Sequence, residues 1–259
     1  MIKFMNSLKT KTWTVSLLLL SLVATPTYAL TPEWVKSVVK TQSDKYLVKE
    51  KVYYSAQGSG VVVNISRTNK SGVVRWESYI LTNAHNTYKT VRVLIKGTSN
   101  NLTKALYTNK DVDTPLFINN IEVEVLKVNK DLDLALLKLT TKEKPKTSPA
   151  TISSAEIGVT DWVIAIGYPG GYGRVITDGY VSEIPANGFP TMFLHSSNTA
   201  RGNSGGGVFR EKKLVGISRK VGFNQQNMPI YHVGFAIRME HILDFLKEYK
   251  NLLTIVNKK

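Results

Sequence analysis

The sequence predicts an all-β fold with a short helix at each end, and three observations support that prediction. From about Val52 onward the chain consists of short runs rich in Val, Ile, Thr and aromatic residues, separated by Gly, Asn, Asp and Pro. Ten or more such runs are typical of a β-sandwich or of β-barrels. The 259 residues, 42% of them hydrophobic, can bury a substantial core.

Residues 1–29 differ in composition from the rest of the chain. Three lysines precede an apolar run from Trp13 to Ala24, and Pro26-Thr27-Tyr28-Ala29 follows. This order is typical of a secretory signal peptide. A membrane anchor is the alternative, but a spanning helix needs about 20 apolar residues and this run has about a dozen. We therefore expect cleavage after Ala29, export to the periplasm or the medium, and no transmembrane segment in residues 30–259.

A helix is expected at each end of the exported chain. Residues 31–39 offer a capping threonine, a proline suited to the first helical position, and valines at helical spacing. Near the other end, residues 239–253 place Ile242, Phe245 and Tyr249 on one face, with Lys and Glu elsewhere. Both segments read as short amphipathic helices.

The charge balance is strongly basic. Lys and Arg total 34 against 19 Asp and Glu, and removal of residues 1–29 lowers the formal net charge from +15 to about +12. Such a surface suits an anionic surface or an acidic protein, although simple solubility explains it equally well. We expect no specific nucleic-acid partner, and the sequence makes no prediction of oligomeric state.

Cysteine is absent from the whole chain. A thiolate nucleophile and thiolate metal sites are therefore excluded, and stability has to come from the core without disulfides. We expect no metal and no cofactor.

The sharpest local motif is Gly202-Asn203-Ser204-Gly205-Gly206. A nucleophilic serine needs a turn that exposes its hydroxyl and aims N–H groups at a developing oxyanion, and glycine permits that backbone. A plain glycine-rich turn is the alternative.

A serine nucleophile also needs a base, and four histidines are present. His85 ends an apolar strand at a small-residue turn, whereas His232 and His241 fall in a late strand and in the terminal helix. His195 is ambiguous, because it lies nine residues before Ser204.

The base in turn needs a carboxylate, and Asp131 and Asp133 precede an apolar strand. Asp133 adjoins that strand and can be partly buried, although Asp is also common in turns. The order His85, Asp133, Ser204 matches one of the known convergent triads.

The motifs in their order resemble the protease domain of HtrA-type, trypsin-like serine endopeptidases over residues 52–250. The resemblance rests on the following segments: Gly58-Ser59-Gly60, Thr82-Asn83-Ala84-His85, Asp133-Leu134-Ala135, Gly167-Tyr168-Pro169, Thr177-Asp178-Gly179-Tyr180-Val181-Ser182 and Val233-Gly234-Phe235-Ala236-Ile237.

The resemblance implies two six-stranded antiparallel β-barrels with the active site between them. The first barrel would span about 50–140 and the second about 153–238. Between them, the polar, proline-marked segment at about 140–152 reads as a linker, and a terminal helix would follow at about 239–253.

The resemblance also implies a reaction. Ser204 would attack the carbonyl of a polypeptide substrate, His85 would act as base and Asp133 would orient it, while the Gly202 and Ser204 N–H groups would bind the oxyanion. The chain ends soon after the terminal helix, so we expect no PDZ domain. Asn203 stands where digestive relatives have an aspartate, so we expect no trypsin-type activation. The alternative function is a catalytically silent homologue that binds an anionic partner.

The primary specificity pocket would be formed by Asn198 and Thr199 before the nucleophile and by Ser218 and Arg219 after it. No acid lies in either segment, which disfavours a preference for Lys or Arg. Two alternatives stay open. Arg219 or Lys220 accepts acidic side chains if it points inward, or the pocket takes small apolar side chains.

Overall fold

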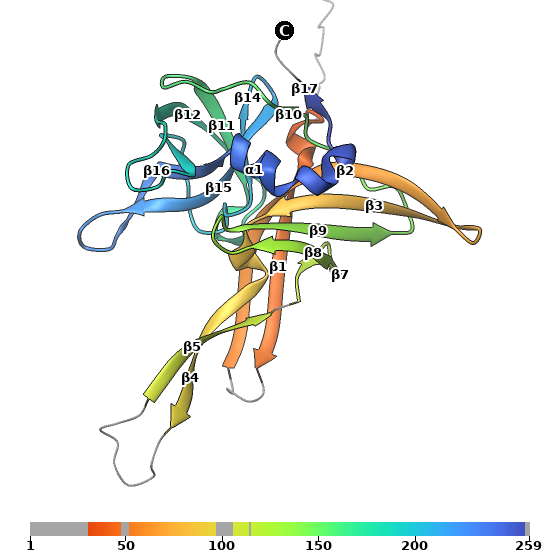
Figure 1. Cartoon of the computed structure of the whole chain (residues 1–259), viewed down its shortest axis with the longest axis horizontal. Coiled ribbons are helices and arrows are strands. Elements are labelled where there is room, and N and C mark those ends of the chain that lie inside the picture. The colour runs from red at the N-terminus through yellow and green to blue at the C-terminus, as the bar shows by residue number, and fades with distance from the viewer. Residues whose placement is uncertain (1–30, 48–51, 97–105, 114, 257–259) are drawn as a thin grey trace, which may run out of the picture. The chain divides into compact units, whose positions relative to one another are not determined.

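The computed structural model describes residues 31–47, 52–96, 106–113 and 115–256 (Figure 1). The predicted signal peptide, residues 1–29, lies outside the described residues. Within the described ranges, no helix combines the length and the apolar character that crossing a bilayer requires.

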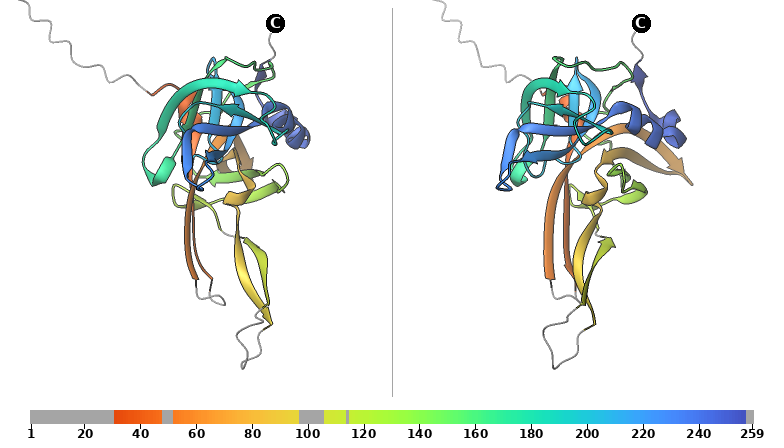
Figure 2. Two further views of the ribbon diagram at one scale, coloured as in Figure 1. Left: turned by 90° about the vertical axis from the view of Figure 1, so that its left-hand side faces the viewer. Right: turned by 60° about the vertical axis from the view of Figure 1, so that its left-hand side comes forward.

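The first sheet has seven strands in the order β7-β6-β1-β2-β3-β9-β8. Its strands are β1 (Val38–Leu47), β2 (Val52–Lys70), β3 (Val73–Thr82), β6 (Phe117–Ile118), β7 (Ile121–Glu122), β8 (Glu124–Asn129) and β9 (Leu134–Thr141). A separate antiparallel hairpin of β4 (Tyr88–Lys96) and β5 (Leu106–Asp113) projects from this sheet in the views of Figures 1 and 2.

The second sheet closes on itself. Its strands are β10 (Ile152–Ser153), β11 (Trp162–Gly167), β12 (Val175–Glu183), β13 (Met192–His195), β14 (Gly207–Arg210), β15 (Lys213–Phe223), β16 (Pro229–Arg238) and β17 (Ile255–Val256). Strand β14 pairs with both β11 and β15, so β14-β11-β12-β13-β16-β15 form a six-stranded ring. Helix α1 (Met239–Phe245) and a 3₁₀ segment (Lys247–Leu252) follow β16.

The predicted fold class is confirmed: the chain is all-β with two antiparallel sheets and little helix. The second sheet is the expected six-stranded barrel. The first sheet is an open half-barrel, because β4 and β5 pair with each other and not with its edges.

The predicted N-terminal helix is wrong. Only Val35–Ser37 form a 3₁₀ turn, and β1 begins at Val38. In a helix, Val38 and Val39 would point about 100° apart, whereas a strand sends them to opposite faces. Each face of the first sheet has its own core, with Val38 buried in one and Val39 in the other. Tertiary burial on both sides therefore outweighs the local helical signal.

Three apolar clusters make up the core. One fills the interior face of the first sheet and includes Val62, Ile80 and Leu137. A second lies inside the closed barrel around Phe193. The largest joins residues of both sheets to α1, which inserts Ile242 and Phe245. This shared core holds the two sheets together at the site where the candidate triad lies.

Candidate active site

The turn that carries Ser204 depends on two glycines in left-handed backbone conformations. Gly202 has φ of +100° and Gly205 has φ of +85°. A Cβ at Gly202 would overlap the Tyr168 carbonyl, and one at Gly205 would overlap the Ser59 carbonyl. Only glycine fits both the dihedral angles and the space. The motif is therefore required by the geometry of this turn.

The backbone on either side of Gly202 is fixed by hydrogen bonds that leave two N–H groups free. The Arg201 carbonyl accepts a bond from Gly170 N–H at 2.8 Å, and the Gly202 carbonyl accepts one from Ser59 Oγ at 2.7 Å. A planar peptide with its carbonyl turned to Gly170 aims the Gly202 N–H the opposite way. Among the described residues, neither this N–H nor that of Ser204 has an acceptor. The two donors are thus available for an oxyanion.

His85 and Asp133 lie in direct contact. His85 is in the 3₁₀ turn Ala84–Asn86 that follows β3, and its Nδ1 is 2.8 Å from Asp133 Oδ2. The His85 backbone N–H also donates to Asp133 Oδ1 at 3.0 Å. Asp133 has φ of +58°, a conformation that Asp tolerates as a single residue before a strand. This arrangement fixes both the position and the ring orientation of the imidazole.

Asp133 is ionised although it is buried, with 6% of its surface exposed. Burial opposes ionisation most strongly. The side-chain hydrogen bond to His85, the charge of His85, its backbone hydrogen bond and then the charge of Arg219 together outweigh burial and lower the pKa of Asp133. Arg219 Nε donates to Asp133 Oδ2 at 3.1 Å, and Asn83 Nδ2 donates to the Asp133 carbonyl at 2.9 Å. Sequence reasoning assigned neither contact.

Ser204 lies at the same cavity as His85 but is not hydrogen-bonded to it. Its Oγ donates to the Arg219 carbonyl at 3.2 Å, and no bond to His85 Nε2 is present among the described residues. Catalytic hydrogen bonds are often long or misaligned in a site without substrate. The Ser204 hydroxyl is thus turned toward the Arg219 carbonyl in this structure.

The cavity holds about 250 Å³ and brings most of the predicted pocket residues together. It is lined by His85, Thr199, Ala200, Arg201, Ser204, Ser218, Arg219, Lys220, Val221 and Phe223. Asn198, also predicted for this pocket, does not line it; its carbonyl accepts a bond from Thr177 Oγ1. The lining has three cationic side chains and no acid.

Neither Arg219 nor Lys220, the two cations considered for acidic substrates, points its charge freely into the cavity. The Arg219 guanidinium turns to Asp133, as described above. The Lys220 ammonium lies 3.1 Å from the centroid of the Phe189 ring. Burial, and then repulsion from Arg219, lower the pKa of Lys220.

His195, which the sequence left ambiguous, is fully buried at the end of β13. Burial lowers its pKa to about 4, and neither ring nitrogen has a hydrogen-bond partner. It does not line the cavity that holds His85 and Ser204. His195 is therefore better explained as a neutral core histidine than as a catalytic base.

Ser59, in the middle of the Gly58-Ser59-Gly60 motif, joins the two sheets behind the nucleophile. Its N–H donates to the Ser204 carbonyl at 2.8 Å, and its Oγ accepts a bond from Tyr168 N–H at 2.9 Å while donating to the Gly202 carbonyl. Asn86 Nδ2 adds a bond of 3.2 Å to the Ser204 carbonyl. The first sheet thus supports the turn that the second sheet carries.

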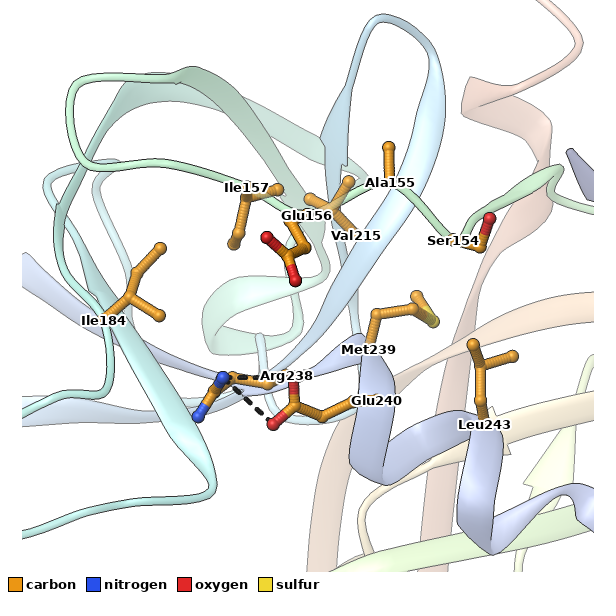
Figure 3. A pocket seen from close by; sticks show the side chains of 10 residues that line it. All are labelled: Ser154, Ala155, Glu156, Ile157, Ile184, Val215, Arg238, Met239, Glu240 and Leu243. Atoms are coloured by element: carbon orange, nitrogen blue, oxygen red, sulfur yellow. Dashed lines mark hydrogen bonds and ion pairs between the residues drawn. The ribbon is translucent and has the colours of Figure 1, made fainter. Parts of the chain in front are cut away.

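A second cavity, of about 340 Å³, lies between the closed barrel and α1 (Figure 3). Its charged groups are Glu156, Arg238 and Glu240, and Arg238 pairs with Glu240 at 3.0 Å. None of the predicted site residues lines it. Across the described part of the chain, no cluster of three or more His, Asp and Glu side chains is arranged to hold a metal ion.

Comparison with known proteins gives the family and the fold. Residues 58–217 match the family model described as trypsin-like peptidase domain. A probable periplasmic serine endoprotease DegP-like of Hahella chejuensis is 31% identical over 124 residues, which cover 46% of this chain and 26% of that protein. The periplasmic pH-dependent serine endoprotease DegQ of Escherichia coli is 26% identical over 174 residues, covering 65% and 32% of the two chains.

A solved structure of the HtrA-type protease AlgW with a tripeptide shares the fold. It superimposes with a TM-score of 0.55 at 21% sequence identity, covering 83% of this chain and 60% of that chain. The chain spans about a quarter to a third of the length of the two curated relatives. Since the family model covers more than half of this sequence and the fold agrees, the chain belongs to the family of trypsin-like peptidase domains.

Proposed function

We propose that this protein is an exported serine endopeptidase that cleaves polypeptides through His85, Asp133 and Ser204. The observation that supports it best is the direct contact of His85 with a buried, ionised Asp133 beside a cavity that Ser204 also lines. The names of its DegP-like and DegQ relatives favour the periplasm as its location. Residues 30–259 would form the mature protease domain, with the first barrel at about 50–140, a linker at about 140–152, the second barrel at about 153–238 and the terminal helix at about 239–253.

In the proposed reaction, Ser204 Oγ attacks the scissile carbonyl and its proton passes to His85 Nε2. Asp133 holds the tautomer in which Nε2 accepts that proton, and it stabilises the imidazolium that results. The oxyanion forms hydrogen bonds to the Gly202 and Ser204 N–H groups. The imidazolium then protonates the leaving amine, an acyl-enzyme remains on Ser204, and water hydrolyses it with His85 again as base.

The primary specificity pocket is proposed to include Thr199, Ser218 and Arg219, which line the cavity, whereas the predicted Asn198 does not. The lining of this cavity combines apolar side chains of Ala200, Val221 and Phe223 with cationic ones. Substrates with a basic side chain at this position would meet like charge. Small apolar or acidic side chains suit the pocket better.

A fluorophosphonate probe tests the function without a known substrate. We expect covalent labelling of Ser204 in the mature protein and none in Ser204→Ala, a change that removes only the nucleophile and should leave the fold intact. His85→Ala should label at a far lower rate, because the base is lost. Folded wild-type protein that binds anionic partners and does not label would instead support the silent homologue.

A further inference from the structure

Arg219 contacts two members of the candidate triad at once. Its Nε is 3.1 Å from Asp133 Oδ2, and its carbonyl accepts the Ser204 hydroxyl at 3.2 Å. Asp133 lies 86 positions away in the chain and belongs to the other sheet. One residue of β15 therefore connects the carboxylate of one sheet with the nucleophile of the other.

A β-bulge explains why this side chain turns toward Asp133. In the pairing of β15 with β16, Ser218 lies opposite Ala236 and Lys220 lies opposite Phe235, which leaves Arg219 as the extra residue. Such a residue is freed from the regular alternation of side chains, and bulges commonly re-aim a side chain next to an active site. The Arg219 guanidinium also packs near Met192, with Nη1 3.8 Å from its Sδ. The side chain is 26% exposed, so its position is partly fixed by packing.

The positive charge of Arg219 compensates the negative charge of the buried Asp133 carboxylate. When His85 is neutral, as a base must be, the buried Asp133 carboxylate has no other cation in contact with it among the described residues. An unpaired buried charge is costly. Arg219 supplies the missing positive charge in the resting site and so favours the ionised form of Asp133.

We propose that Arg219 is a positioning residue, which acts through Asp133: it keeps the carboxylate ionised, in the place where it orients His85, as the pH falls. This inference rests on the proposed function. Among the described residues, the charged or titratable groups paired with Asp133 are His85 and Arg219, and Arg201 and Lys220 line the cavity with them. Of the three cations, Arg219 alone is paired with Asp133.

The test measures the rate of fluorophosphonate labelling as a function of pH in full-length protein. In Arg219→Ala we expect the acid limb of the profile, where the rate falls with falling pH, to move upward by roughly 0.5 to 1 pH unit, because Asp133 loses the cation that favours its ionised form. Arg219→Lys should keep the limb near its wild-type position. Millimolar guanidinium ion should restore labelling of Arg219→Ala at low pH, by occupying the space beside Asp133.

Arg210→Ala is the matched control, since it removes another part-buried Arg–Asp pair, with Asp161, outside the site. Its labelling profile should not move, and guanidinium should not affect it. If Arg219→Ala does not fold, as judged by circular dichroism, Arg219→Gln replaces it and should shift the limb in the same direction. An unmoved limb without rescue in a folded variant overturns the role of Arg219. Absence of labelling in the wild type would instead overturn the proposed function.

Discussion

At the scale of single residues, Gly202 carries the strictest requirement. Its φ of +100° and the closeness of the Tyr168 carbonyl exclude any side chain. Its N–H is one of the two donors aimed at the proposed oxyanion. A change at this position should therefore affect both the backbone and the reaction.

We predict that Gly202→Ala lowers turnover of a protein substrate such as casein by about 100-fold or more. The added Cβ displaces the backbone, so that the N–H no longer reaches the oxyanion, and loss of one oxyanion donor has an effect of that size. The measurement is kcat on a fluorescent casein. Gly173→Ala is the control, because a Cβ at Gly173 meets no atom within 4 Å. A Gly202→Ala variant with ordinary turnover would contradict the assignment of the oxyanion site.

His195 is the residue whose burial has the clearest consequence for stability. Its pKa is about 4 in the folded protein against an ordinary 6.5, so the unfolded chain binds the extra proton first. Stability should be unaffected above about pH 6.5 and should fall as the pH drops from there toward 4, by up to about 3 kcal/mol.

Urea denaturation between about pH 4 and about pH 7.5, a range that spans this titration, measures the loss of stability. His195→Leu should show a flatter dependence of the free energy of unfolding on pH, because it cannot be protonated. His232→Asn serves as the control, since His232 is exposed on β16 and its substitution should leave the slope unchanged. Equal slopes in wild type and His195→Leu would refute the prediction.

At the scale of secondary-structure elements, the site depends on contacts between strands and turns of different sheets. Strand β2 supplies Ser59, which bonds the turns of Tyr168, Gly202 and Ser204. The bulge of β15 supplies Arg219, which reaches Asp133 before β9. The elements that carry the proposed triad are thus joined by specific polar bonds.

Ser59→Ala should destabilise the fold by about 1 to 3 kcal/mol, because it leaves the Tyr168 N–H and the Gly202 carbonyl without their partner. Casein turnover should also fall, since the Gly202 backbone loses its support. Thermal unfolding and kcat provide the two measurements. Ser182→Ala, at an exposed position on β12, should change neither. If Ser59→Ala were as stable and as active as wild type, the supporting role would be wrong.

At the scale of the whole molecule, charge shapes what the enzyme would accept. The chain has a formal net charge of +15, and Arg201, Arg219 and Lys220 line the cavity, whose lining contains no acid. Long-range attraction then favours acidic polypeptides during encounter. The same field opposes a basic side chain in the pocket.

We predict that a peptide with Lys at the position before the cleaved bond has a kcat/KM at least about tenfold lower than the same peptide with Met, a neutral chain of similar length. A third peptide with Glu distinguishes an acidic from an apolar preference. Raised salt should narrow the difference between Lys and Met, because it screens the charges. Preferred cleavage after Lys would show that the pocket is not cationic in function.

The all-β fold class, the terminal helix and the family could be predicted from the sequence by itself, because each depends on local pattern: strand alternation, helical spacing and glycines that allow one backbone. The triad assignment of His85, Asp133 and Ser204 stays a prediction, and the structure adds that His85 and Asp133 are in contact. Only the tertiary structure turned residues 38–47 into a strand, since two cores bury adjacent valines on opposite sides. It alone paired Arg219 with Asp133, because that contact depends on a bulge and on sheet packing between residues 86 positions apart.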